Sequence, residues 1–103
     1  MQEFENIELK LKGKIYGSGP VQAEGTINGF PFYFRARHDM WTFSISESPE
    51  VDPVDIQMIE QGENHGFFAE GRVGQEREYV ASYLNPDKVQ DIIQECSKIY
   101  LNK

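Results

Sequence analysis

The sequence predicts an α+β fold: a six-stranded antiparallel meander, curled and packed by a C-terminal amphipathic helix. Two patterns indicate this fold. Short runs in which apolar and polar residues alternate are separated by turn residues over most of the chain, and apolar residues recur every three or four positions near its end. The chain has 103 residues, of which 39% are hydrophobic, so we expect a single domain over residues 1–103 with one core.

The first half of the chain contains four of the expected strands. Residues 7–15 and 21–27 both alternate, and a glycine-rich break lies between them. The dipeptide Asn28-Gly29 then joins the second run to a third, residues 30–37, as a type I′ hairpin turn, because both residues tolerate a positive φ. A fourth run covers residues 41–46. The side chains expected on the buried face include Ile7, Leu9, Leu11, Ile15, Val21, Ala23, Ile27, Phe30, Phe32, Phe34, Ala36, Trp41, Phe43 and Ile45.

The second half of the chain predicts a long acidic connection between strands four and five, a second hairpin and a helix. Residues 48–66 contain two prolines and two glycines around a weakly helical piece, residues 54–61. Residues 67–73 and 77–84 read as strands five and six. The final helix is expected from Pro86 to Leu101, with Asn85 as its N-cap, since proline is favoured at the first helical position.

One helix is too narrow to cover such a sheet. Six strands spaced by roughly 4.8 Å span about 24 Å, whereas a helix covers about 10 Å. Three arrangements would solve this: the piece 54–61 packs beside the final helix, the sheet curls, or two chains pair face to face. We favour a curled sheet, with a possible homodimer through an uncovered sheet face.

The net charge of −7 is concentrated in one part of the sequence. Residues 39–71 contain eight acidic residues and neither Lys nor Arg, while the rest of the chain is close to neutral. Such a run creates a negative potential that attracts a basic partner, although an acidic loop can also serve solubility alone. We therefore expect a small protein-binding domain, of inhibitor or accessory type, that meets a basic protein surface through the connection 47–63. The residues expected to bind this partner are Glu47, Glu50, Asp52, Asp55, Glu60 and Glu63.

An alternative site is the solvent-facing side of the sheet. Lysines line this side of the first expected strand, and Tyr33, Arg35 and Arg37 line it on the third. Cations interleaved with an aromatic side chain are typical of surfaces that bind single-stranded nucleic acid or another anionic ligand. The overall negative charge argues against nucleic acid as a partner, and outward-facing Lys and Arg are also ordinary strand residues.

The sequence contains no motif that predicts an enzyme, a metal site or a cofactor. Neither His38 nor His65 has a partner at a catalytic or metal-binding spacing, and the glycine-rich segment 17–20 lacks the Gly-Lys-Ser/Thr of a phosphate-binding loop. Cys96 is the only cysteine, so the chain cannot form an internal disulfide, and this favours a reducing compartment. Cys96 lies on the apolar stripe of the final helix. No basic leader and no long apolar run are present, so we expect a cytoplasmic protein without membrane contact.

Overall fold

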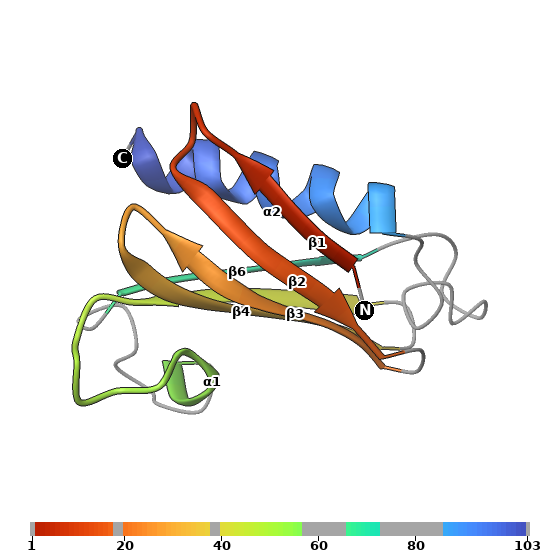
Figure 1. Ribbon diagram of the computed structural model, residues 1–103. Helices are drawn as coiled ribbons and strands as arrows, with labels where there is room; N and C mark the ends of the chain where they lie inside the picture. Colours follow the sequence, from red (N-terminus) through yellow and green to blue (C-terminus); the bar gives the residue numbers. More distant parts are fainter. Residues whose placement is uncertain (1, 18–19, 38–39, 57–65, 73–85, 103) are drawn as a thin grey trace.

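The computed structural model describes residues 2–17, 20–37, 40–56, 66–72 and 86–102. Six strands form one sheet in the order β1-β2-β3-β4-β5-β6, and every neighbouring pair is antiparallel (Figure 1). The elements are β1 (Gln2–Asn6), β2 (Leu11–Tyr16), β3 (Val21–Ile27), β4 (Phe30–Arg37), β5 (Met40–Ser46), α1 (Pro53–Ile56), β6 (Gly66–Arg72) and α2 (Pro86–Leu101). The α+β class with a six-stranded antiparallel sheet and a C-terminal helix is thus confirmed.

The first expected strand, residues 7–15, is wrong at its N-terminal half. Residues 7–10 form a turn that joins the unexpected strand β1 to β2, and Ile7, expected in the core, is 81% exposed. The backbone N–H of Leu9 donates to Asn6 Oδ1 at 3.1 Å, and Lys10 takes a φ of 54°. An Asn side chain that accepts a local backbone bond stabilises a turn, and this turn overrides the alternation. The expected strand 77–84 lies outside the described residues.

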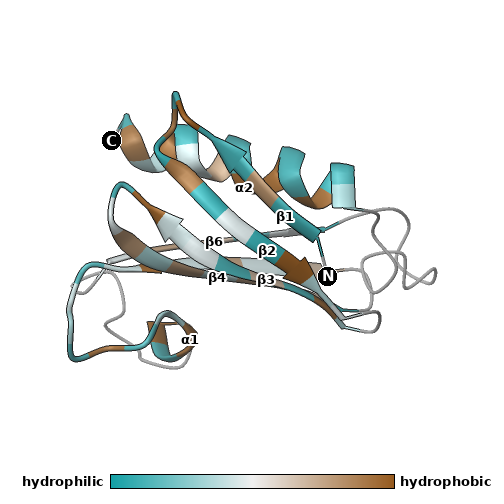
Figure 2. Ribbon diagram, in the orientation of Figure 1, coloured by the Kyte–Doolittle hydropathy of each residue, from teal (hydrophilic) through white to brown (hydrophobic). Residues whose placement is uncertain are grey.

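The hairpin at Asn28-Gly29 is confirmed. Both residues have positive φ, 51° for Asn28 and 86° for Gly29, as a type I′ turn requires. The turn fixes the register of β3 against β4, so that Ile27 pairs with Phe30 and Ala23 with Phe34. Hydrophilic and hydrophobic residues also alternate along the neighbouring strand β2 (Figure 2).

The core lies between α2 and one face of the sheet, which we call the inner face. Strand residues on this face are buried together with the apolar stripe of α2. The members of this core are Phe4, Leu11, Ile15, Val21, Ala23, Ile27, Phe32, Phe34, Ala36, Phe43, Ile45, Val89, Ile93, Cys96 and Tyr100. These side chains are already buried within one chain, so no face-to-face pairing of two chains is needed to cover them.

Two aromatic rings approach each other over a pair of glycines in the sheet. The register places Phe4 opposite Gly13, Gly13 opposite Gly25, and Gly25 opposite Phe32. β1 and β4 are three strands apart, about 14 Å in a flat sheet. The rings of Phe4 and Phe32 nevertheless lie with centroids 6.3 Å apart. Two positions without a side chain allow the rings to approach each other over β2 and β3.

The short helix α1 lies on the other face of the sheet, the outer face, and not beside α2 (Figure 1). Residues 54–56 therefore do not pack next to the final helix, which corrects that arrangement for this part of 54–61; residues 57–61 lie outside the described residues. The helix is described only over Pro53–Ile56, where Ile56 is buried. Its neighbours in the fold are β4, β5 and β6. Buried serines of β5 form hydrogen bonds with the backbone of this segment on the outer face.

Candidate functional site

A groove with a volume of about 810 Å³ lies on the outer face. We call it the polar groove. β1 forms one side, residues 52–54 form the opposite side, and β2, β3 and β4 form the floor. Its lining residues are Glu3, Phe4, Glu5, Lys12, Gly13, Lys14, Glu24, Gly25, Thr26, Pro31, Phe32, Tyr33, Asp52, Pro53 and Val54.

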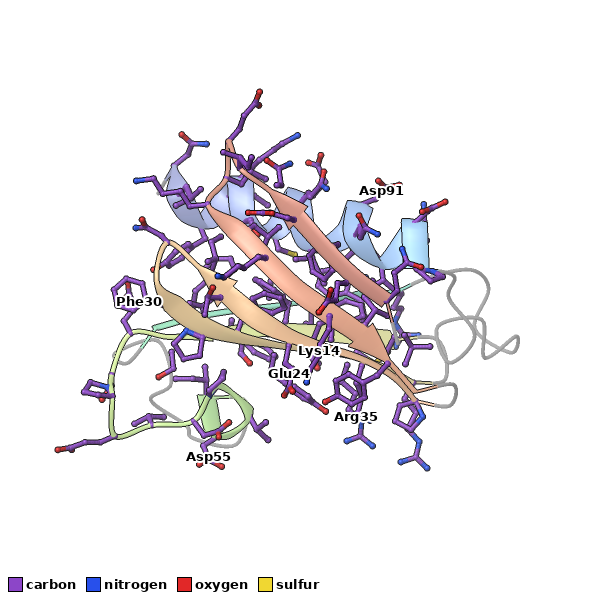
Figure 3. The ribbon with its side chains drawn as sticks, in the orientation of Figure 1. Lys14, Glu24, Phe30, Arg35, Asp55 and Asp91 are labelled. Atoms are coloured by element: carbon purple, nitrogen blue, oxygen red, sulfur yellow. The ribbon has the colours of Figure 1, made fainter. Side chains whose placement is uncertain are left out.

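Charges of opposite sign alternate from strand to strand across the groove. The register places Glu3 of β1 opposite Lys14 of β2, and Lys14 opposite Glu24 of β3. Lys14 Nζ lies 3.5 Å from Glu24 Oε1, and both side chains are about half exposed. Figure 3 places these two side chains, and Arg35, on the side of the sheet that carries α1. An exposed pair of this kind contributes about 0–1 kcal/mol, so it orders the floor more than it stabilises the fold.

Carboxylates nevertheless outnumber ammonium groups in the polar groove. Its lining holds four carboxylates against two lysines, a net charge of −2. Neither Glu3 nor Glu5 forms an ion pair with any residue in the described ranges. Asp52 stands on the opposite side, and its Oδ1 accepts the backbone N–H of Val54 at 2.9 Å. Asp52 thereby caps α1, an arrangement that the sequence signals by an N-cap residue followed by proline.

Buried serines of β5 form hydrogen bonds with the segment 48–53, which leads into the groove side formed by residues 52–54. Ser44 and Ser46 are buried on the outer face. The Ser44 hydroxyl donates to the Pro53 carbonyl. Ser46 Oγ lies within hydrogen-bonding distance of the Ser48 and Val51 carbonyls and accepts the N–H of Ser48. Every one of these hydroxyls therefore has a backbone partner, which fixes the segment that carries Asp52.

Apolar surface accompanies the charges. Val54 is 44% exposed although it is a large hydrophobic residue, and it lines the groove beside Pro53. Pro31 and the ring of Tyr33 contribute from β4. A second hollow of about 550 Å³ adjoins the groove, shares Pro31, Asp52 and Pro53 with it, and contains Glu47 and Glu50. The two hollows form one depression with acidic rims and apolar patches.

The acidic residues expected to bind a partner have different positions. Asp52 lines the polar groove, Glu47 and Glu50 line the second hollow, and Asp55 is exposed but lines neither. Glu60 and Glu63 lie outside the described residues. Glu47 also has a structural partner, because Tyr100 of α2 donates its hydroxyl to Glu47 Oε2 at 2.6 Å.

The hydrogen bond between Tyr100 and Glu47 predicts that the free energy of unfolding decreases at alkaline pH. Burial, followed by the hydrogen bond to Glu47 and its negative charge, raises the pKa of Tyr100 above its ordinary value of 10.0. The unfolded chain therefore releases this proton first, so the contribution is complete below about pH 10 and declines as the pH rises further. We expect Tyr100→Phe to lower the free energy of unfolding by about 1 kcal/mol at neutral pH and to flatten its decline above about pH 10. Urea denaturation of both proteins from neutral to alkaline pH measures this difference, and parallel stability curves would contradict it.

The residues of the alternative site are only partly brought together. Tyr33, Arg35 and Arg37 all lie on the outer face of β4, but only Tyr33 lines the polar groove. Tyr33 donates its hydroxyl to Gln22 Oε1 at 2.7 Å. Partial burial is the main cause that raises the pKa of Tyr33, with Arg35 opposing and Glu24 adding to the shift. The phenol thus stays protonated at neutral pH and acts as a hydrogen-bonding and stacking group.

Glu3 and Glu5 are site residues that sequence reasoning missed, because β1 was not expected. The available signal was the alternation Glu3, Phe4, Glu5 followed by the turn-forming Asn6. His38 and His65 lie outside the described residues. Burial raises the pKa of the Cys96 thiol to about 11, which makes it a poor nucleophile.

Within the described ranges, no three His, Cys, Asp or Glu side chains are placed to hold a metal ion. None of the described helices has the length and apolar character needed to cross a membrane. No protein-family model matches the chain, and neither a curated protein nor a solved structure is found to be similar to it.

Proposed function

We propose that this chain is a non-enzymatic binding domain that holds a basic segment of a partner protein in the polar groove and the second hollow. The observation that carries this proposal is the presence of carboxylates on both sides of one depression, Glu3 and Glu5 on β1 and Asp52 across the groove. In the sequence, the acidic character of this segment continues through the expected connection 47–63. An inhibitor or accessory role in the cytoplasm fits such a domain.

Charge and apolar contact contribute differently to such binding. The negative field attracts a basic partner and raises the association rate, which falls with ionic strength. Affinity depends on a few side chains that become buried at the centre of the interface. Val54 and Tyr33 are the described groove residues suited to that role, because one is exposed and apolar and the other is aromatic.

The direct test removes three carboxylates of residues 50–55: two that line the hollows, and the exposed Asp55 beside them. We call this protein the rim variant. We expect Glu50→Gln, Asp52→Asn and Asp55→Asn together to reduce capture of wild-type partners from a lysate of the source cells at least about tenfold at low salt. Immobilised wild type and variant are compared by quantitative mass spectrometry over a salt series. Asp52→Asn keeps an N-cap side chain on α1, so the fold should survive.

The matched control carries the same change in charge elsewhere. Glu8→Gln, Asp91→Asn and Glu95→Gln together remove three exposed carboxylates from the β1–β2 turn and α2, away from the groove. Equal capture by the rim variant and this control would refute the proposal.

The rival function is binding of single-stranded RNA on Tyr33, Arg35 and Arg37. It would replace our proposal if the wild type bound an oligonucleotide, Arg35→Ala with Arg37→Ala abolished that binding, and the rim variant left it intact.

A further inference from the structure

β1 is an edge strand whose two faces differ in chemistry. One edge of β1 pairs with β2, and no described strand pairs with its other edge. Alternation places Glu3 and Glu5 on the outer face, at the rim of the polar groove, and Phe4 on the inner face. An unpaired edge presents backbone N–H and C=O groups to which a further strand can bond.

The rows of charge across the sheet end on β1 with a negative sign. One row runs from Glu3 to Lys14 to Glu24, and the next runs from Glu5 to Lys12. Lys14 forms its ion pair with Glu24, which leaves the Glu3 carboxylate without one among the described residues. A strand placed beyond β1 would continue both rows with the correct sign if it carried lysine or arginine opposite Glu3 and Glu5.

We propose that the basic segment of the partner adds as a strand to the edge of β1 that no described strand pairs with, a proposal that rests on the function proposed above. The segment has the pattern basic, apolar, basic. Its two basic side chains, two residues apart and roughly 6.8 Å from each other in an extended strand, meet Glu3 and Glu5. The apolar residue between them falls on the inner face, next to Phe4.

The same charges disfavour the other occupant of such an edge, a second copy of this chain. Two β1 strands side by side would place carboxylates of one copy next to those of the other, and like charges on neighbouring strands are destabilising. Glu3 and Glu5 thus protect the edge from self-association while leaving it open to a basic strand.

A peptide of ten residues in which lysine and valine alternate is a suitable probe. We expect it to bind the full chain, to slow hydrogen exchange of β1 amides, and to bind Glu3→Gln with Glu5→Gln at least about tenfold more weakly. The double substitution retains side-chain shape and removes no buried contact, so it should fold. Glu8→Gln with Asp91→Asn is the matched control and should bind like the wild type.

Backbone pairing is tested with two N-methylated forms of this peptide. In an extended strand all lysine N–H groups point to one edge and all valine N–H groups to the other. Strand addition therefore predicts that methylation of only one residue type weakens binding at least about tenfold. If both forms bind as tightly as the parent peptide and β1 amides exchange unchanged, the strand-addition proposal is overturned while groove binding stands. If the rim variant instead retains its natural partners, the proposed function fails independently of this result.

Discussion

Replacing Phe32 with alanine should lower the free energy of unfolding by about 3–5 kcal/mol, a large part of the roughly 5–15 kcal/mol that holds a domain of this size together. Phe32 is only 1% exposed and lies at the centre of the inner face. Its ring centroid is 5.5 Å from that of Phe43 and 6.3 Å from that of Phe4. Chemical denaturation followed by tryptophan fluorescence, with Trp41 as the reporter, measures the loss.

The size of this effect depends on whether the neighbours can close the cavity. Phe32→Leu removes less volume and should cost clearly less than Phe32→Ala. A loss below about 1 kcal/mol for the alanine variant would mean that the rings of β1 and β5 collapse into the space, and that the core does not depend on Phe32.

Local signals were sufficient to predict much of the sheet. The alternation over residues 21–27 and 30–37 and the Asn28-Gly29 turn gave the correct strands and register, because a two-residue turn and a buried face leave a single pairing. The helix from Pro86 to Leu101 was also predicted with its observed bounds, since an N-cap and a first-turn proline coincide with an apolar stripe.

Other features depend on contacts that a pattern does not encode. The turn at residues 7–10 interrupts a run that alternates without a break. Its hydrogen bonds, from the Leu9 N–H to Asn6 and from the Lys10 N–H to the Ile7 carbonyl, cannot be read from that alternation. The side of the sheet taken by α1 depends on where Ser44 and Ser46 find backbone partners, which is a tertiary relation.

In the candidate site, too, some features follow from the local sequence and others depend on tertiary contacts. The sequence predicted the acidic character of the segment that carries Asp52, because charge can be counted along the chain. It did not predict that Glu3 and Glu5 stand across the groove from Asp52, because that depends on β1 pairing with β2. Nor did it predict that Glu47 accepts a hydrogen bond from Tyr100, which is 53 residues away in sequence.

Adding a single methyl group at Gly25 should be nearly as damaging as removing a ring from the core. A Cβ at this position would collide with the Lys12 carbonyl oxygen and with Gly13 Cα in the neighbouring strand, and both are backbone atoms that cannot rotate away. We expect Gly25→Ala to lower the free energy of unfolding by about 3 kcal/mol, at the upper end of typical overpacking costs. Thermal and denaturant unfolding measure the loss.

Gly29→Ala is the control variant that distinguishes the steric effect at Gly25 from the cost of a positive φ. Gly29 has open space around the position of a Cβ, but its φ of 86° is unfavourable for alanine, so the cost should be about 1 kcal/mol. Because a Cβ at Gly25 would collide with backbone atoms of Lys12 and Gly13, Gly25→Ala must separate β2 from β3. It should then also disturb the amide resonances of Lys12, Lys14 and Glu24 on the floor of the polar groove. A Gly25→Ala protein as stable as Gly29→Ala, with these resonances unchanged, would show that the strands can yield locally and that the groove does not require the glycine pair.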